Sequence, residues 1–209
     1  MKDVVGLEDI ELRGCVTDAI GTIALALGKE KFRPYMDKSF HLALEGMKSE
    51  QSRLRESAFG FFAVIAAVLK EELAPALPEI MPAISHTLDQ DEIDLGEKVT
   101  EDEAKALLNG DTDIIDTDDE DDDETLELNV SSGLYIEKEV AAYALGEIFV
   151  NVSGHFLPYL EKSTEQLVEL ADSFVEGSRK AALVALWKFV MTLAKLQVTE
   201  PWQPGLPAV

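Results

Sequence analysis

Nine acidic residues and no basic one lie in the stretch "DTDDEDDDETLE", which runs from Asp116 to Glu127. Carboxylates at this density attract lysine and arginine side chains, and they repel nucleic acid and anionic lipid. The densest part is a run of seven consecutive acids that ends at Glu124. The candidate binding residues are its first six: Asp118, Asp119, Glu120, Asp121, Asp122 and Asp123. The run predicts binding of a basic protein, with no direct contact to nucleic acid or a membrane. The alternative is a loop that only keeps the protein in solution.

The acidic run belongs to a longer segment, from Asp89 to Glu127, that holds nineteen of the 41 acidic residues of this 209-residue chain. Such a segment cannot bury enough apolar surface to offset its ordering entropy, so we expect it to be largely disordered. Its attraction for a basic partner should weaken with salt, because the screening length falls from about 10 Å at 0.1 M to about 3 Å at 1 M.

Residue types used in catalysis and metal binding are present but are not grouped. Three histidines are isolated from one another and from the one cysteine: His41, His86 and His155. A calcium loop is excluded because Ile115 interrupts the alternation begun by Asp111 and Asp113, and the glycine that such a loop requires is missing. The glycines are scattered and form no phosphate loop. We therefore predict no enzyme activity, no metal site and no cofactor.

A second group of polar residues is expected on the exposed edges of helices, where each carboxylate can hold one lysine or arginine of an extended peptide. The candidates are Asp18, Glu56, Glu137, Glu139, Glu147 and Asn151. The alternative is a solvated helix edge with local ion pairs, such as Glu56 with Arg53. Two other residues are assigned to the core: Trp187, and Cys15 as a small buried hydrophobe.

These residues are positioned by a repeat of about forty residues, visible in four similar segments. The segments are Leu12–Leu27, Leu54–Leu69, Glu137–Val152 and Ser178–Leu193. A basic residue lies at or near the start of each: Arg13, Arg55, Lys138 and Arg179. The steps between these basic residues are 42, 83 and 41, so the middle step spans two periods and contains the acidic insertion.

Each repeat is predicted to contain two helices. Proline follows the basic residue by 20 or 21 positions at Pro34, Pro75 and Pro158, and proline is tolerated in the first turn of a helix. The helix that opens with proline, helix A, has a narrow apolar stripe; the helix that opens with the basic residue, helix B, is apolar on several sides and should be buried. We expect B helices at 9–28, 51–70, 135–152 and 175–196, and A helices at 31–47, 73–89 and 156–171.

Paired helices that repeat in this way predict an all-α HEAT-type solenoid, a superhelix of antiparallel helix pairs. The expected organisation is HEAT repeats in 1–89, an acidic and largely disordered insertion in 90–134, HEAT repeats in 135–197, and a proline-rich tail in 198–209 that leads to a truncated next repeat. Both ends of the array are expected to be open, as in a piece of a longer solenoid.

The tract "SSGLYIEKEVAAYALGEIF" (Ser131–Phe149), between the acidic insertion and "FLPYL" (Phe156–Leu160), resembles the karyopherin-β family, the importin-β type of nuclear transport receptor. The segment "SRLRESAFGFFAVIAAVL" (Ser52–Leu69) is similar to the same family. The resemblance extends from about Leu12 to Leu196 and is strongest to the branch that imports histones and ribosomal proteins. One departure concerns the aspartate that HEAT repeats often carry six residues before the arginine of helix B. This sequence has Leu7, Ser49, Ser132 and Ser173 there.

The resemblance implies central repeats of a receptor whose B helices line a concave face that binds basic cargo, such as histones and ribosomal proteins. In the full-length receptor it also implies binding of Ran GTPase and of Phe-Gly nucleoporins, and shuttling between cytoplasm and nucleus through the nuclear pore. Two other functions remain open at this point. The chain could be a HEAT scaffold that assembles folded proteins, or an acidic module of the histone-chaperone kind.

Overall fold

The computed structural model describes residues 7–90, 122–173 and 175–197, with side chains for 9–90, 133–173 and 175–197. Every regular element within these ranges is a helix. The chain is therefore an all-α array of helix pairs, which confirms the predicted solenoid fold. The predicted tail at 198–209 and most of the predicted insertion, 91–121, lie outside the described residues.

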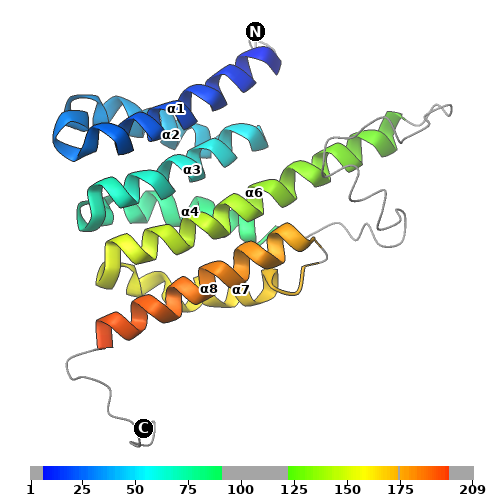
Figure 1. The fold of residues 1–209 in the computed structure, drawn as a ribbon. Coiled ribbons are helices and arrows are strands. Elements are labelled where there is room, and N and C mark those ends of the chain that lie inside the picture. Colours follow the sequence, from blue (N-terminus) through cyan, green and yellow to red (C-terminus); the bar gives the residue numbers. More distant parts are fainter. Residues whose placement is uncertain (1–6, 91–121, 174, 198–209) are drawn as a thin grey trace, which may run out of the picture.

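Four long helices pack side by side as one layer (Figure 1). They are α1 (Leu7–Phe32), α3 (Ser52–Leu69), α6 (Asp122–Val152) and α8 (Glu176–Gln197). Helix α3 packs between α1 and α6, and α6 packs between α3 and α8. These are the predicted B helices. We call the side of this layer that faces the viewer in Figure 1 the B-helix face.

Three shorter helices form a second layer behind the first (Figure 1). They are α2 (Met36–Met47), α4 (Leu77–Leu88) and α7 (Leu160–Leu170). Helix α2 packs on α3, α4 on α6, and α7 on α8. These are the predicted A helices, and each shows the expected narrow apolar stripe, with only its inward residues buried.

The chain reverses from B helix to A helix in the same way in the three pairs. The fifteenth residue after the basic residue has positive φ in each: Gly28 (71°), Lys70 (53°) and Ser153 (57°). Short 3₁₀ turns come next: η1 (Arg33–Tyr35), η2 (Lys70–Ala76) and η5 (Ser153–Tyr159). Each turn contains one of the predicted prolines, two residues before the A helix begins. Glycine alone adopts positive φ without steric cost, so Lys70 and Ser153 hold strained backbone.

Phenylalanine rings fill the core between the two layers. Phe40 of α2 lies edge-on to Phe61 and Phe62 of α3, with ring centroids 6.1 and 5.5 Å away. In the C-terminal half, the Phe149 ring centroid lies 4.8 Å from that of Phe156 and 4.9 Å from that of Phe189. Aromatic pairs in these geometries add to the free energy gained from apolar burial. The first cluster holds α2 on α3, and the second joins α6, the turn η5 and α8.

The boundary of the predicted insertion needs correction, because α6 begins at Asp122 and not at residue 135. After the consecutive aspartates the chain continues as "ETLELNV", and leucine and glutamate are good helix formers. The average composition of the whole predicted insertion does not show this local change from aspartates to helix-forming residues.

The stretch Gly133–Leu170 is long and apolar enough to cross a membrane, with a mean hydropathy of 1.3 in its best window. Half of that window is buried against other parts of the protein, and the stretch contains two helices joined by η5. Its hydropathy is that of a core helix.

Candidate functional site on the B-helix face

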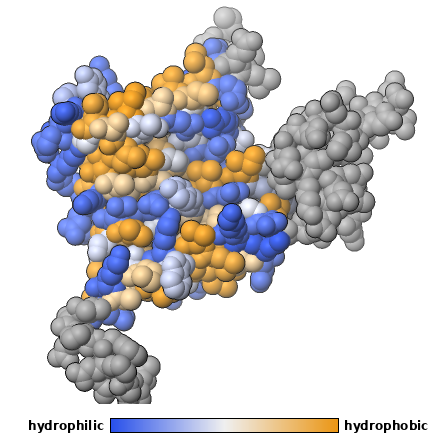
Figure 2. All heavy atoms as spheres, in the orientation of Figure 1, coloured by the Kyte–Doolittle hydropathy of each residue, from blue (hydrophilic) through white to orange (hydrophobic). Residues whose placement is uncertain are grey.

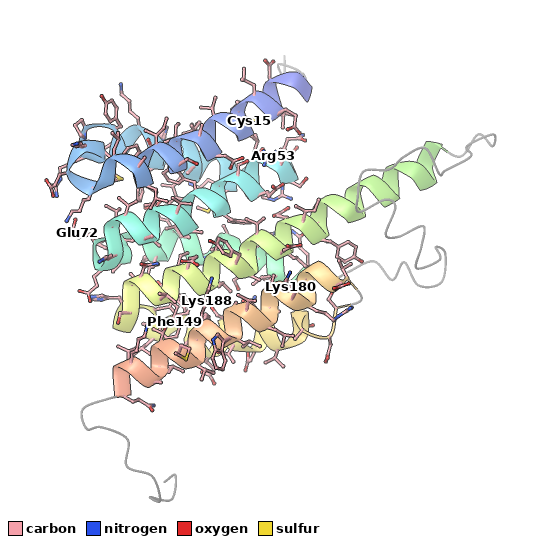
Figure 3. All side chains as sticks on the ribbon, in the orientation of Figure 1. Cys15, Arg53, Glu72, Phe149, Lys180 and Lys188 are labelled. Carbon is pink, nitrogen blue, oxygen red and sulfur yellow. The ribbon has the colours of Figure 1, made fainter. Side chains whose placement is uncertain are left out.

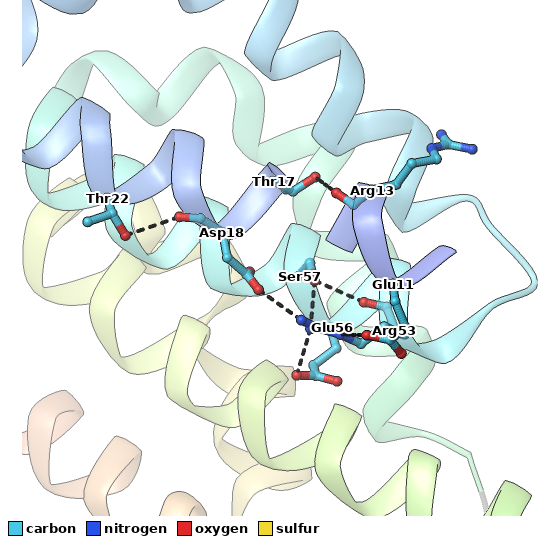
Figure 4. A network of polar contacts seen from close by, with 8 residues as sticks. All are labelled: Glu11, Arg13, Thr17, Asp18, Thr22, Arg53, Glu56 and Ser57. Carbon is cyan, nitrogen blue, oxygen red and sulfur yellow. Dashed lines mark hydrogen bonds and ion pairs between the residues drawn. The ribbon is translucent and has the colours of Figure 1, made fainter. Parts of the chain in front are cut away.

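Arg53 of α3 is the centre of a charged network that joins α1 to α3 on the B-helix face (Figure 4). Its guanidinium donates to Asp18 at 3.0 Å and to Glu11 at 3.4 Å, both on α1. On its own helix it donates to Glu56 at 3.1 Å and to Ser57 at 2.8 Å. Three carboxylates therefore share one guanidinium, so this part of the face keeps an excess of negative charge.

Two of the predicted binding residues, Asp18 and Glu56, belong to this network. Asp18 is exposed, while Glu56 is partly buried. Burial is the main reason that the pKa of Glu56 is raised; the charge of Arg53 opposes the rise, and Asp18 and Glu11 add to it. The predicted local pair of Glu56 with Arg53 is present, but the sequence alone did not indicate that α1 supplies the other two carboxylates.

A second polar group joins α6 to α8. Lys188 donates to Glu147 at 2.6 Å and lies 4.6 Å above the ring of Tyr143. Asn151 donates to the backbone carbonyl of Glu147 at 2.8 Å. Two more of the predicted residues, Glu147 and Asn151, are therefore already engaged within the protein. Lys188 and Tyr143 were missed by the sequence analysis, although Lys188 lies at the repeat position equivalent to Glu147.

Glu137 is not a binding residue on an exposed edge, which corrects the prediction. Its side chain is 0% exposed. Its two oxygens accept hydrogen bonds from Arg55 of α3 at 2.7 and 2.6 Å, and one of them also accepts from Thr87 of α4 at 2.7 Å. A buried charge needs such partners. Glu137 thus links α6 to α3 and α4, and its buried carboxylate is not accessible to a ligand.

Backbone contacts of the arginines, together with Glu137, replace the aspartate that HEAT repeats often carry. Arg55 donates to the backbone carbonyl of Ser49 at 2.8 Å, and Arg179 donates to that of Ser173 at 2.9 Å. Both carbonyls lie six residues before the arginine. The serine backbone therefore takes the place of an aspartate side chain within the repeat, and Glu137 supplies the ionic link from one B helix to the next.

The remaining predicted residues divide between the exposed surface and the segment that is not described. Glu139 is exposed near the start of α8, where its carboxylate approaches Gly177. Asp122 and Asp123 are the first residues of α6, and only their backbone is described. Asp118, Asp119, Glu120 and Asp121 lie outside the described residues. The acidic run and the B-helix face are therefore joined through α6.

The two residues assigned to the core are on the surface. Trp187 is 65% exposed on α8, together with other apolar residues on a side of α8 that no described helix covers. Cys15 is exposed on α1 (Figure 3). It lies four residues after Glu11 and three before Asp18, so it shares their side of the helix. No group of three histidine, cysteine or acidic side chains in the described part of the chain is arranged to hold a metal ion.

An array of stacked helix pairs of this kind is a HEAT-type α-solenoid, a class whose extended surfaces bind other proteins. No protein-family model matches the chain. It is 47% identical over 206 residues to a probable importin subunit beta-4 of Schizosaccharomyces pombe, covering 96% of this chain and 19% of that protein. Importin-4 of Homo sapiens is 37% identical over 81 residues, 39% of this chain and 8% of that protein. Importin-4 of Mus musculus is 26% identical over 190 residues, 85% of this chain and 17% of that protein.

The chain belongs to the importin-β family. It spans about a fifth of the length of the S. pombe relative. The match extends over nearly the whole chain and agrees with the helix pairs seen in the structure.

Proposed function

We propose that this chain is the part of a nuclear import receptor that captures a basic protein cargo, using the B-helix face together with the acidic insertion. The observation that carries the proposal is the excess of carboxylates around Arg53, on a face of an importin-β-type array. A lysine or arginine of the cargo that comes close to Glu11 or Asp18 finds negative charge that Arg53 alone does not neutralise. Histones and ribosomal proteins have the required charge.

The acidic run from Asp116 to Glu127 would act before this contact is made. Its charge raises the local concentration of a basic protein and speeds encounter. Since α6 begins within the run, the captured cargo is delivered beside the B-helix face. In the longer protein, we expect other repeats to bind Ran GTPase and Phe-Gly nucleoporins, and we expect the protein to move between cytoplasm and nucleus through the nuclear pore.

The test is the binding of a lysine- and arginine-rich peptide across a salt series by two variants with the same change in charge. One variant carries D118N, D119N, E120Q and D121N, which leave α6 untouched. The control carries E161Q, E165Q and E169Q on α7 and D172N just after it, away from the B-helix face. We expect the first variant to associate about fivefold more slowly at low salt, and the control to change less than twofold. Equal rates for the two variants would refute a role for the insertion.

The same salt series separates the other two functions. A scaffold for folded proteins would show little salt dependence, and the four substitutions in the insertion would not alter its binding. An acidic chaperone would lose nearly all binding when the insertion is neutralised. An import receptor of the proposed kind would retain part of its affinity through the B-helix face when the insertion is neutralised. Further substitutions at Asp18 and Glu11 would then weaken the binding of that variant again.

A further inference from the structure

Apolar residues that are exposed or partly exposed occupy the same repeat position on all four B helices. Twelve residues after the basic residue of each repeat, the chain has Leu25, Ala67, Val150 and Met191. The exposed fractions of the three larger side chains are 57%, 39% and 43% for Leu25, Val150 and Met191, and Ala67 is partly exposed. We call these four residues the apolar row.

Equivalent positions of neighbouring B helices lie next to each other, so the row crosses the face from helix to helix. Glu147 and Lys188 are each nine residues after their basic residue and are in contact at 2.6 Å. A Cβ placed on Gly21, eight residues after Arg13, would lie 3.8 Å from the Cβ of Val64, nine residues after Arg55. The helices are thus in register along the layer.

Packing within the array does not account for the row. Helix α6 is covered on both flanks by α3 and α8 and from behind by α4, yet its open side carries exposed Ile136, Tyr143 and Val150. An open helix side would otherwise be polar. Figure 2 views this face and shows apolar side chains exposed among hydrophilic ones over its helices. Single exposed apolar residues are normal on a protein surface. It is their alignment at one repeat position across an open face that points to contact with a partner.

The distance between neighbouring B helices determines how far apart the apolar side chains of a docked partner must be. Packed helices are about 8–10 Å apart. An extended segment in the polyproline II conformation advances about 3.1 Å per residue with three residues per turn, so it presents the same side about every 9 Å. Such a segment, crossing the B helices, therefore turns about every third side chain toward a new helix. Asp18, Glu56 and Glu139 lie about two to three helical turns before the row on α1, α3 and α6. Their charge favours positive charge on that side of the segment.

We propose that the apolar row docks an extended segment of the cargo that has large apolar side chains at every third position and basic side chains between them. This inference rests on the proposed function and adds to it a requirement for apolar residues. The cargo is attracted by the carboxylates that precede the row on the B helices and is held by apolar contact at the row.

Three peptides of thirteen residues test the inference. The first has leucine at every third position and lysine or serine elsewhere; the second has the same composition with its leucines clustered at one end; the third has serine in place of leucine. Their affinities are measured by fluorescence anisotropy for the complete chain and two triple variants. The row variant carries L25S, V150S and M191S. The control carries V16S, L183S and V190S, exposed apolar residues of α1 and α8 that lie outside the row.

We expect the row variant to bind the first peptide about tenfold more weakly, a loss of about 1.4 kcal/mol, and the control to change less than twofold. The unmodified chain should prefer the first peptide to the second. Equal loss in both variants, no loss in the row variant, or equal affinity for the two leucine peptides would each overturn the inference. The leucine-free peptide tests the proposed function separately, because its salt-dependent binding requires the carboxylates but not the row. Circular dichroism checks that both variants are folded.

Discussion

Glu137 provides the sharpest test of how the repeats are held together, and the substitution is Glu137→Met. The carboxylate is fully buried, accepts two hydrogen bonds from Arg55 and one from Thr87, and connects α3, α4 and α6. Methionine has a similar length but no acceptor, so the substitution leaves a guanidinium in a largely buried place without its counter-charge. Breaking a buried ion pair by removing one partner costs about 3–5 kcal/mol.

The free energy of unfolding is measured by urea denaturation followed by circular dichroism, on E137M, R55M and the double variant R55M/E137M. We expect E137M to lose about 3–5 kcal/mol, and the double variant to recover most of that loss, because replacing both partners of a buried pair by apolar residues is often nearly neutral. The matched control is D89N, which removes an exposed pair with Lys162 at 2.8 Å and should cost less than about 1 kcal/mol. A loss below about 1 kcal/mol in E137M, or additive losses in the double variant, would refute the idea that this pair fastens the helices.

Three further predictions follow from the strained turns, the network around Arg53 and the pKa of Asp89. Lys70→Gly should raise the free energy of unfolding by about 1 kcal/mol, because glycine adopts the positive φ without strain. Gly28→Ala should lower the free energy of unfolding for the opposite reason. Thermal unfolding of the two variants measures both changes. Arg53→Gln should strengthen binding of a basic peptide at low salt by about threefold, because three carboxylates lose their shared counter-charge. Arg13→Gln is the control, since that side chain points away from the network (Figure 4), and equal effects in the two variants would contradict the prediction. The hydrogen bond from Lys162 is the main cause that holds the pKa of Asp89 below its usual range. A carboxyl group with a lowered pKa stabilises the fold at pH values above its ordinary pKa. The difference in unfolding free energy between the unmodified chain and D89N should therefore shrink as the pH falls from about 5 to about 3. A difference that stays constant over this range would contradict the prediction.

The repeat and the helix pairs were predictable from sequence because they leave periodic signals. The basic residues, the prolines 20 or 21 positions later and the apolar sides of the helices all recur. Apart from the start of α6, which lies at Asp122, the structure places the helices close to the predicted boundaries. Even the turns share a positive φ at one repeat position, at Gly28, Lys70 and Ser153. Lys70 and Ser153 gave no sign of positive φ because their residue types do not favour it.

The candidate site was harder to predict because it depends on which helices become neighbours. Glu137 looks like an exposed helix edge in the sequence, and only the packing of Arg55 and Thr87 against it shows that it is buried. Trp187 looks like a core residue because α8 is apolar on several sides, one of which no described helix covers. Aligning the repeats by position would have revealed the apolar row, since Leu25, Val150 and Met191 share one place in the repeat.

Cys15 allows the most direct measurement of whether basic cargo binds the B-helix face. It is the one cysteine of the chain, it is exposed, and it lies between Glu11 and Asp18 on α1. Its rate of alkylation is measured with and without a saturating lysine- and arginine-rich peptide. The control is a variant with C15S and V190C, which moves the thiol to an exposed place on α8 outside the face. The proposed function predicts that the peptide slows alkylation of Cys15 several-fold and leaves the rate at position 190 unchanged. Equal rates at Cys15 with and without bound peptide would contradict it.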